Sequence, residues 1–206
     1  MPDSLIEGFK CFVNEQYEGD NPLMPYLVAE GQNPDYFIIS CIDSRSHAGV
    51  IFNTPPGTFF SHKSMGAIVR PYKTGTTLAA SLQFALQYNE VKTVILLGHT
   101  SCGAVKALID DIDDPEIKSF IEVTKQGLEN AKADEADVPL QRRVEEHVLK
   151  VSRKNIETHP SVQKALARNQ IQIKTWIFDM HEAAIFELND DTDNFEMIVK
   201  KENKNA

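Results

Sequence analysis

Two short apolar runs separated by an amphipathic segment constrain the fold of this chain most strongly. Residues 36–41 (Tyr-Phe-Ile-Ile-Ser-Cys) form a β-rich run that enters a polar turn, and residues 91–97 form a second run of this kind. Between them, residues 76–88 repeat apolar side chains at helical spacing, namely Leu78, Leu82, Ala85 and Leu86. A helical pattern follows over residues 104–109. The order strand, helix, strand, helix predicts a parallel α/β sheet.

The second half of the chain continues this pattern. An acidic stretch over residues 110–137, bracketed by Pro115 and Pro139, predicts a solvated helix. The sequence predicts a further helix over 141–157 and a strand of alternating apolar residues over 171–178. It also predicts two closing strands, over 183–188 and 195–199. No linker or repeat interrupts the chain, so we expect one domain over 1–206 with a disordered tail over 200–206.

Composition excludes several classes of function. The chain has 206 residues and a formal net charge of -9, which disfavours nucleic acid and anionic membranes as partners. No apolar run approaches the roughly 20 residues of a membrane helix, and the N-terminus lacks a secretory signal pattern. Three cysteines do not indicate a disulfide scaffold. We therefore expect a cytoplasmic protein whose thiols are ligands or core residues.

Three soft or borderline metal donors fall at predicted strand ends. Cys41 ends the first run, and His99 and Cys102 follow the second in a His-x-x-Cys turn. Carboxyl ends of parallel strands meet at one sheet edge, where ligands normally bind. Two thiolates and an imidazole suit zinc, and three protein ligands leave a fourth position for water or substrate. Taken separately, each feature has a simpler explanation. Cys41 could be a small core residue, and the His-x-x-Cys spacing could occur by chance.

The residues after Cys41 strengthen the metal interpretation. Asp43 and Arg45 place a carboxylate and a guanidinium beside the predicted metal. A bidentate pair would hold the carboxylate away from the metal and lower its pKa, whereas without Arg45 the carboxylate could become a fourth ligand. A purely structural ion pair is the alternative.

At these motifs the chain resembles a known family. Residues 41–45 (Cys-Ile-Asp-Ser-Arg) look like the C-x-D-S-R motif of the β-carbonic anhydrases, and residues 98–103 resemble their G-H-x-x-C-G motif. The similarity extends over about residues 30 to 190. It implies a central four-stranded parallel sheet extended by an antiparallel strand and flanked by helices. It also implies a helical arm over 1–26 that embraces a neighbour in a homodimer or homotetramer.

The resemblance also implies an activity. A β-carbonic anhydrase is a zinc lyase that interconverts carbon dioxide and bicarbonate, here with Cys41, His99 and Cys102 as ligands and with Asp43 and Arg45 as catalytic residues. Asp43 would either ligate zinc or accept a hydrogen bond from the reacting hydroxide. Two alternatives stay open: a hydrolase of carbonyl sulfide or carbon disulfide on the same scaffold, and a catalytically weak zinc-binding oligomer.

The chain departs from the family pattern at one segment. Residues Lys63 to Ala67 (Lys-Ser-Met-Gly-Ala) stand where the family usually has Arg-Asn-x-(Ala/Gly)-Asn. Lysine does not reproduce the five planar donors of arginine, so efficiency, the subunit interface or the substrate could differ. Elsewhere we expect Cys11 to be a buried thiol of the arm, and His47 and His62 to be surface residues or proton shuttles.

Overall fold

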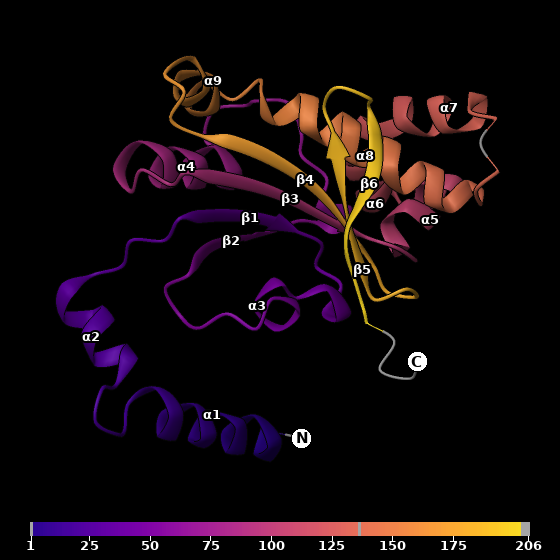
Figure 1. Ribbon diagram of the computed structural model, residues 1–206. Coiled ribbons are helices and arrows are strands. Elements are labelled where there is room, and N and C mark those ends of the chain that lie inside the picture. The colour runs from indigo at the N-terminus through magenta and orange to yellow at the C-terminus, as the bar shows by residue number, and fades with distance from the viewer. Residues whose placement is uncertain (1, 136, 203–206) are drawn as a thin grey trace.

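A mixed six-stranded sheet flanked by helices forms the body of the molecule (Figure 1). The computed structural model describes residues 2–135 and 137–202. The strand order is β2-β1-β3-β4-β5-β6. The four parallel strands are β1 (Tyr36–Ser40), β2 (Phe59–Lys63), β3 (Thr93–His99) and β4 (Gln172–Asp179). The strands β5 (Ala184–Asn189) and β6 (Asn194–Lys200) extend the sheet in antiparallel fashion.

The parallel register determines where the site is built. Ser40, the last residue of β1, lies opposite Leu97 in β3. Cys41 therefore leaves the sheet beside the carboxyl end of β3, where His99 is the last strand residue. All seven residues of β3 are buried, as expected for the central strand of a sheet covered on both faces.

Nine α-helices are described. They are α1 (Pro2–Gln16), α2 (Leu23–Glu30), α3 (Ala48–Ile51), α4 (Thr77–Gln83), α5 (Gly103–Ile109), α6 (Pro115–Ile121), α7 (Lys125–Ala133), α8 (Leu140–Ile156) and α9 (Pro160–Ala167). A π-helical turn over Phe84–Tyr88 extends α4. None of the described helices is long and apolar enough to cross a membrane.

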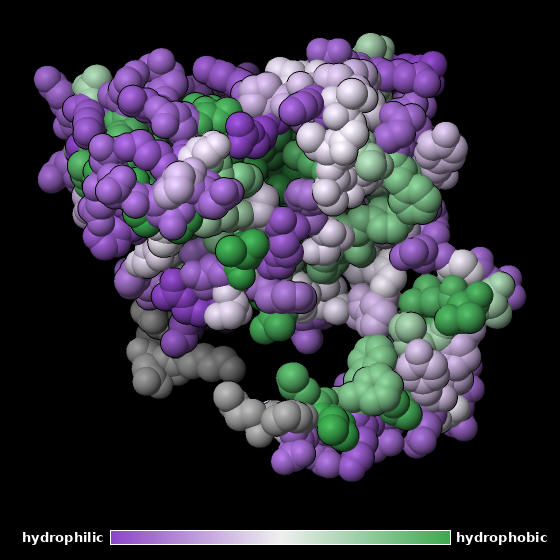
Figure 2. All heavy atoms as spheres, turned by 180° about the vertical axis from the view of Figure 1, so that it is seen from behind, coloured by the Kyte–Doolittle hydropathy of each residue, from purple (hydrophilic) through white to green (hydrophobic). Residues whose placement is uncertain are grey.

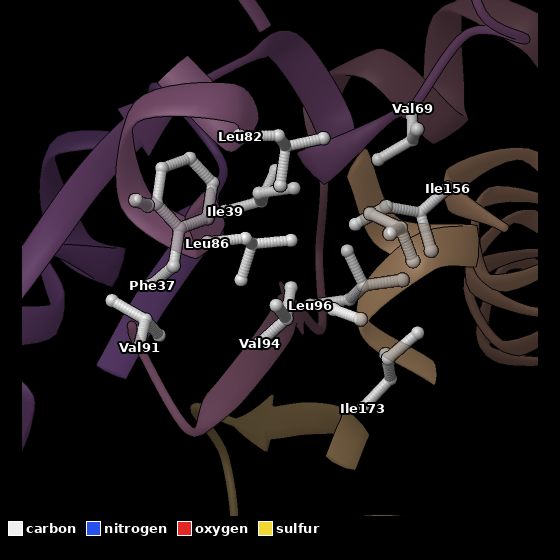
Figure 3. Packing of buried hydrophobic residues seen from close by; sticks show 13 residues of the cluster. Phe37, Ile39, Val69, Leu82, Leu86, Val91, Val94, Leu96, Ile156 and Ile173 are labelled. Carbon is white, nitrogen blue, oxygen red and sulfur yellow. The ribbon is translucent and has the colours of Figure 1, made fainter. Parts of the chain in front are cut away.

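The largest core cluster lies between the sheet and the helices α4, α8 and α9. Phe37 and Ile39 of β1 and Leu96 of β3 are buried against Leu82 of α4 and Ile156 of α8 (Figure 3). Burial of such side chains contributes about 1.5–3 kcal/mol each, so this face fixes α4 and α8 on the sheet.

The N-terminal helices stand away from the body (Figure 1). Leu5, Ile6 and Phe9 of α1 are 78%, 54% and 62% exposed, and Figure 2 shows hydrophobic side chains on this segment facing an open space. Cys11 is exposed, so the expectation of a buried thiol is wrong within one chain. The reason is that no other described segment of the chain covers the side of α1 on which Cys11 lies.

The expected α/β architecture is confirmed, with three differences in detail. The parallel part of the sheet includes β2, which the sequence analysis did not identify. The acidic stretch forms two helices, α6 and α7, in place of one. Lys200, expected at the start of the tail, ends β6. The rest of that predicted tail, residues 203–206, lies outside the described residues.

Candidate metal centre

Cys41, His99 and Cys102 come together at the carboxyl edge of the sheet. Their ligand atoms all lie within 4.8 Å of one another, and all three side chains are buried. Cys41 follows β1, His99 ends β3, and Cys102 caps α5. Three donors from two neighbouring strands therefore meet at one point, as the sequence predicts.

The ring of His99 presents a free lone pair to this cluster. Its Nδ1 lies 2.9 Å from the carbonyl oxygen of Thr100, which can only accept, so Nδ1 carries the proton. In the neutral ring Nε2 is then unprotonated, and this buried atom has no hydrogen-bond partner among the described residues. An orphaned nitrogen facing two thiols is costly to bury unless it ligates a metal. The donor set fits Zn²⁺, which binds sulfur and imidazole nitrogen with three protein ligands at catalytic sites.

The two cysteines shift each other's pKa in opposite directions. A hydrogen bond from Cys102, opposed by burial and assisted by His99, lowers the pKa of Cys41 to about 4. The same hydrogen bond and burial raise the pKa of Cys102. The site therefore favours a negative charge on Cys41 over one on Cys102, and a divalent cation would be needed to hold both sulfurs as thiolates.

Asp43 lies beside the donor cluster and is held by an ion pair with Arg45. Arg45 donates from Nε to Asp43 Oδ1 at 3.0 Å and from Nη2 to Oδ2 at 2.8 Å. Oδ1 also accepts the Arg45 backbone N–H at 2.8 Å. These bonds hold the pKa of Asp43 well below its usual range. Asp43 Oδ2 is 3.9 Å from His99 Nε2, so the carboxylate borders the space in front of the lone pair.

The segment that departs from the family pattern supports Cys41. Gly66 donates its backbone N–H to Cys41 Sγ at 3.2 Å, and Lys63 Nζ donates to the Cys41 carbonyl at 2.9 Å. Gly66 has φ of 66°, and a Cβ there would come within 3.1 Å of Ala104 Cβ. Glycine is therefore required for this contact. Sequence reasoning named the segment but missed its role, which depends on contacts 22 and 25 residues apart.

A further residue that the sequence analysis missed, Glu145, lies on α8. Glu145 is buried, and its Oε1 accepts the backbone N–H of Cys102 at 3.0 Å. Its position on an amphipathic helix gave no signal that it faces the site.

The two histidines considered as shuttles lie outside the donor cluster. The ring of His62 stacks on Phe37 with centroids 6.5 Å apart, and burial lowers its pKa. His47 precedes α3 and lines a hollow together with Phe12 of α1.

Comparison with known proteins agrees with this geometry. A sequence model of the family described as "Carbonic anhydrase" matches residues 36–185. The chain is 27% identical over 193 residues to a carbonic anhydrase of Synechococcus elongatus, covering 89% of this chain and 70% of that protein.

Two solved structures show the same architecture. The β-carbonic anhydrase CcaA has a TM-score of 0.83 at 25% identity, covering 98% of this chain and 92% of that one. A tetrameric β-carbonic anhydrase of Sordaria macrospora has a TM-score of 0.71 at 21% identity, covering 98% and 95%. The sheet order, the Cys–His–Cys cluster and these matches lead to one conclusion: the chain belongs to the β class of the carbonic anhydrase family, whose members are lyases.

Proposed function

We propose that Cys41, His99 and Cys102 hold one Zn²⁺ ion and that the chain uses it to interconvert carbon dioxide and bicarbonate. The observation that carries this proposal is the buried, unpartnered Nε2 of His99 facing two thiols. Zinc at such a site supplies Lewis acidity that makes water a nucleophile near neutral pH. The roles below belong to the chain's own residues.

Asp43 is the residue that would orient the reacting water. Its carboxylate is anionic at every pH of interest because Arg45 lowers its pKa, and it borders the space in front of His99 Nε2. A carboxylate so placed accepts a hydrogen bond from the water and leaves a lone pair of that water directed at the substrate carbon. Arg45 would keep Asp43 from becoming a fourth metal ligand, because it occupies both carboxylate oxygens.

We propose carbon dioxide as the substrate, in place of carbonyl sulfide or carbon disulfide, because of the family match. A hydrolase of carbonyl sulfide or carbon disulfide would use the same donor cluster. The supporting sequence relatives bear the name carbonic anhydrase, which favours carbon dioxide as the substrate of this chain.

We also propose that the chain is a homodimer or homotetramer. The described residues leave Leu5, Ile6 and Phe9 of α1 uncovered, and a tetrameric protein of the same fold exists.

The test combines metal analysis with stopped-flow assays. Purified protein should contain one zinc per chain and should hydrate carbon dioxide, with much slower turnover of carbonyl sulfide and carbon disulfide. Protein that carries no zinc after expression in zinc-replete medium contradicts the metal assignment. Zinc-loaded protein that turns over only a sulfur substrate contradicts the substrate assignment.

A further inference from the structure

We propose that Gln141 and Glu145, one turn apart on α8, form a clamp on the backbone of Cys102 that positions its thiolate for the metal. We call these two residues the Cys102 clamp. The inference rests on the metal site proposed above and assigns two positioning residues to it.

The clamp holds both polar backbone groups of Cys102. Glu145 Oε1 accepts the Cys102 N–H at 3.0 Å, and Gln141 Nε2 donates to the same Oε1 at 3.1 Å. Gln141 Nε2 also lies 3.5 Å from the Cys102 carbonyl oxygen. The two side chains therefore restrain the backbone on each side of the Cys102 Cα atom, and through it the direction of the Cα–Cβ bond that carries Sγ.

The turn that carries Cys102 needs such a restraint. It is a tight connection between β3 and α5, and Ser101 within it has φ of 58°, a left-handed conformation that is costly for a residue other than glycine. Cys102 is the N-cap of α5 but provides no side-chain capping bond. A strained turn persists only when its surroundings hold it, and α8 supplies the contact from outside the turn.

Gly98 lets α8 pack close to β3, because a glycine leaves room for Leu149 of the helix. A Cβ at Gly98 would lie 2.6 Å from Cδ1 of Leu149, so α8 packs directly on the backbone of β3. Gln141, Glu145 and Leu149 are spaced by four residues and lie along one face of the helix. The contact at Gly98 thus brings Glu145 over Cys102, four residues further along the chain from Gly98.

The burial of Glu145 argues against an incidental contact. Glu145 is 4% exposed, and no ion pair to it is found among the described residues. Its neighbour Glu146, in contrast, pairs with Arg142 at 2.8 Å. A buried carboxyl group without a direct ion pair is costly, and burial raises the pKa of Glu145 despite the opposing charges of Arg142 and His99. The clamp itself needs only an acceptor oxygen, which the side chain offers whether or not it carries a proton.

Three full-length variants separate a positioning role from a structural one. Glu145→Leu removes the acceptor, Glu145→Gln keeps an acceptor oxygen but no charge, and Glu146→Gln removes the neighbouring charge as a control. Zinc affinity is measured by competition with a chromogenic chelator, and geometry by the thiolate-to-metal absorption of the cobalt-substituted protein. We expect Glu145→Leu to bind zinc roughly 10–100-fold more weakly, with an altered cobalt spectrum. Glu145→Gln and Glu146→Gln should stay within about threefold of wild type.

Two results with the Glu145 variants would overturn the clamp. A Glu145→Leu protein with wild-type affinity and spectrum would show that Cys102 needs no positioning. A Glu145→Gln protein as weak as Glu145→Leu would show that charge, not the hydrogen bond, is what matters. If Glu145→Leu does not fold, Gln141→Leu decides: weaker zinc binding supports the clamp and unchanged binding rejects it. Wild-type protein that binds no zinc would instead refute the metal site itself.

Discussion

Arg45 and Asp43 form a two-point contact, with Nε–Oδ1 at 3.0 Å and Nη2–Oδ2 at 2.8 Å. This planar arrangement uses both carboxylate oxygens and leaves Oδ2 at 3.9 Å from the free nitrogen of His99. Arg45 also extends Nη2 to the carbonyl of Ser101 at 3.4 Å, which ties the loop after β1 to the turn after β3. The pair therefore both orients a carboxylate and joins the two segments that carry the donors.

The first prediction concerns this pair. Arg45→Ala should retain zinc but lose activity by roughly 10²-fold or more, because Asp43 is then free to bind the metal and no longer orients water. Arg45→Lys should restore only part of the activity, since an ammonium group cannot make the two-point contact. Stopped-flow hydration rates with parallel metal analysis measure this. Full activity of Arg45→Ala at neutral and alkaline pH would reduce Arg45 to a structural residue.

The second prediction concerns the thiols. Cys41→Ser and Cys102→Ser should each lose stoichiometric zinc and activity, because a neutral hydroxyl is a far weaker zinc ligand than a thiolate. Cys11→Ser is the matched control, since Cys11 is exposed on α1 and lies outside the donor cluster. Elemental analysis of the three proteins provides the measurement. Retention of one zinc per chain by Cys102→Ser would mean that the donors have been misassigned.

The third prediction concerns the packing of α8 on the sheet. Gly98→Ala should lower the free energy of unfolding by about 1–3 kcal/mol, because the new Cβ would overlap Leu149 and the helix must move. Gly103→Ala serves as the control, since no atom of the described residues lies within 4 Å of a Cβ at that position. Urea titration of both variants compares them. Equal stability of Gly98→Ala and wild type would show that α8 shifts without cost.

The fourth prediction concerns acid sensitivity at His159, which is buried and whose Nε2–H donates to the Arg70 carbonyl at 3.2 Å. Burial lowers the pKa of His159, so the folded state takes up a proton less readily than the unfolded chain. Stability should therefore fall as pH drops below about 6.5, the ordinary histidine value, towards the lowered folded pKa.

The measurement is the unfolding free energy of metal-free protein at neutral and mildly acidic pH. His159→Gln should lose less stability between the two than wild type, because it has no proton to gain. His181→Gln, which changes an exposed histidine, is the control. An identical loss in wild type and His159→Gln would rule out His159 as a source of the acid sensitivity.

The fifth prediction concerns the arm. The double variant Leu5→Ser and Phe9→Ser should dissociate the assembly towards the 23.1 kDa monomer, because it removes the most exposed apolar side chains of α1. Lys10→Gln, which alters only a surface ion pair with Glu7, should leave the assembly intact. Light scattering at micromolar concentration reports the masses. A wild-type monomer would reject the proposed oligomer.

The sequence alone determined the features that are local. The runs before Cys41 and before His99 are apolar and β-rich because they are buried strands, so their order predicts a parallel sheet and a common edge for their ends. Asp43 and Arg45 are two residues apart, and the contact between them could be inferred from that spacing. Cys41, His99 and Cys102 were found because each follows or ends a predicted strand and lies in a short motif.

Only the tertiary structure decided which residues support the metal donors. β2 was missed because Phe59–Lys63 is half-exposed at the edge of the sheet and mixes apolar with polar residues. Gly66 and Lys63 reach Cys41 across 25 and 22 residues, and Glu145 reaches Cys102 across 43. On a helix, a glutamate predicts a solvated face, because charge is costly to bury without a partner. Only the packing of α8 on Gly98 turns the Glu145 side of the helix towards the metal site. The spacing of apolar residues along the sequence does not predict such packing.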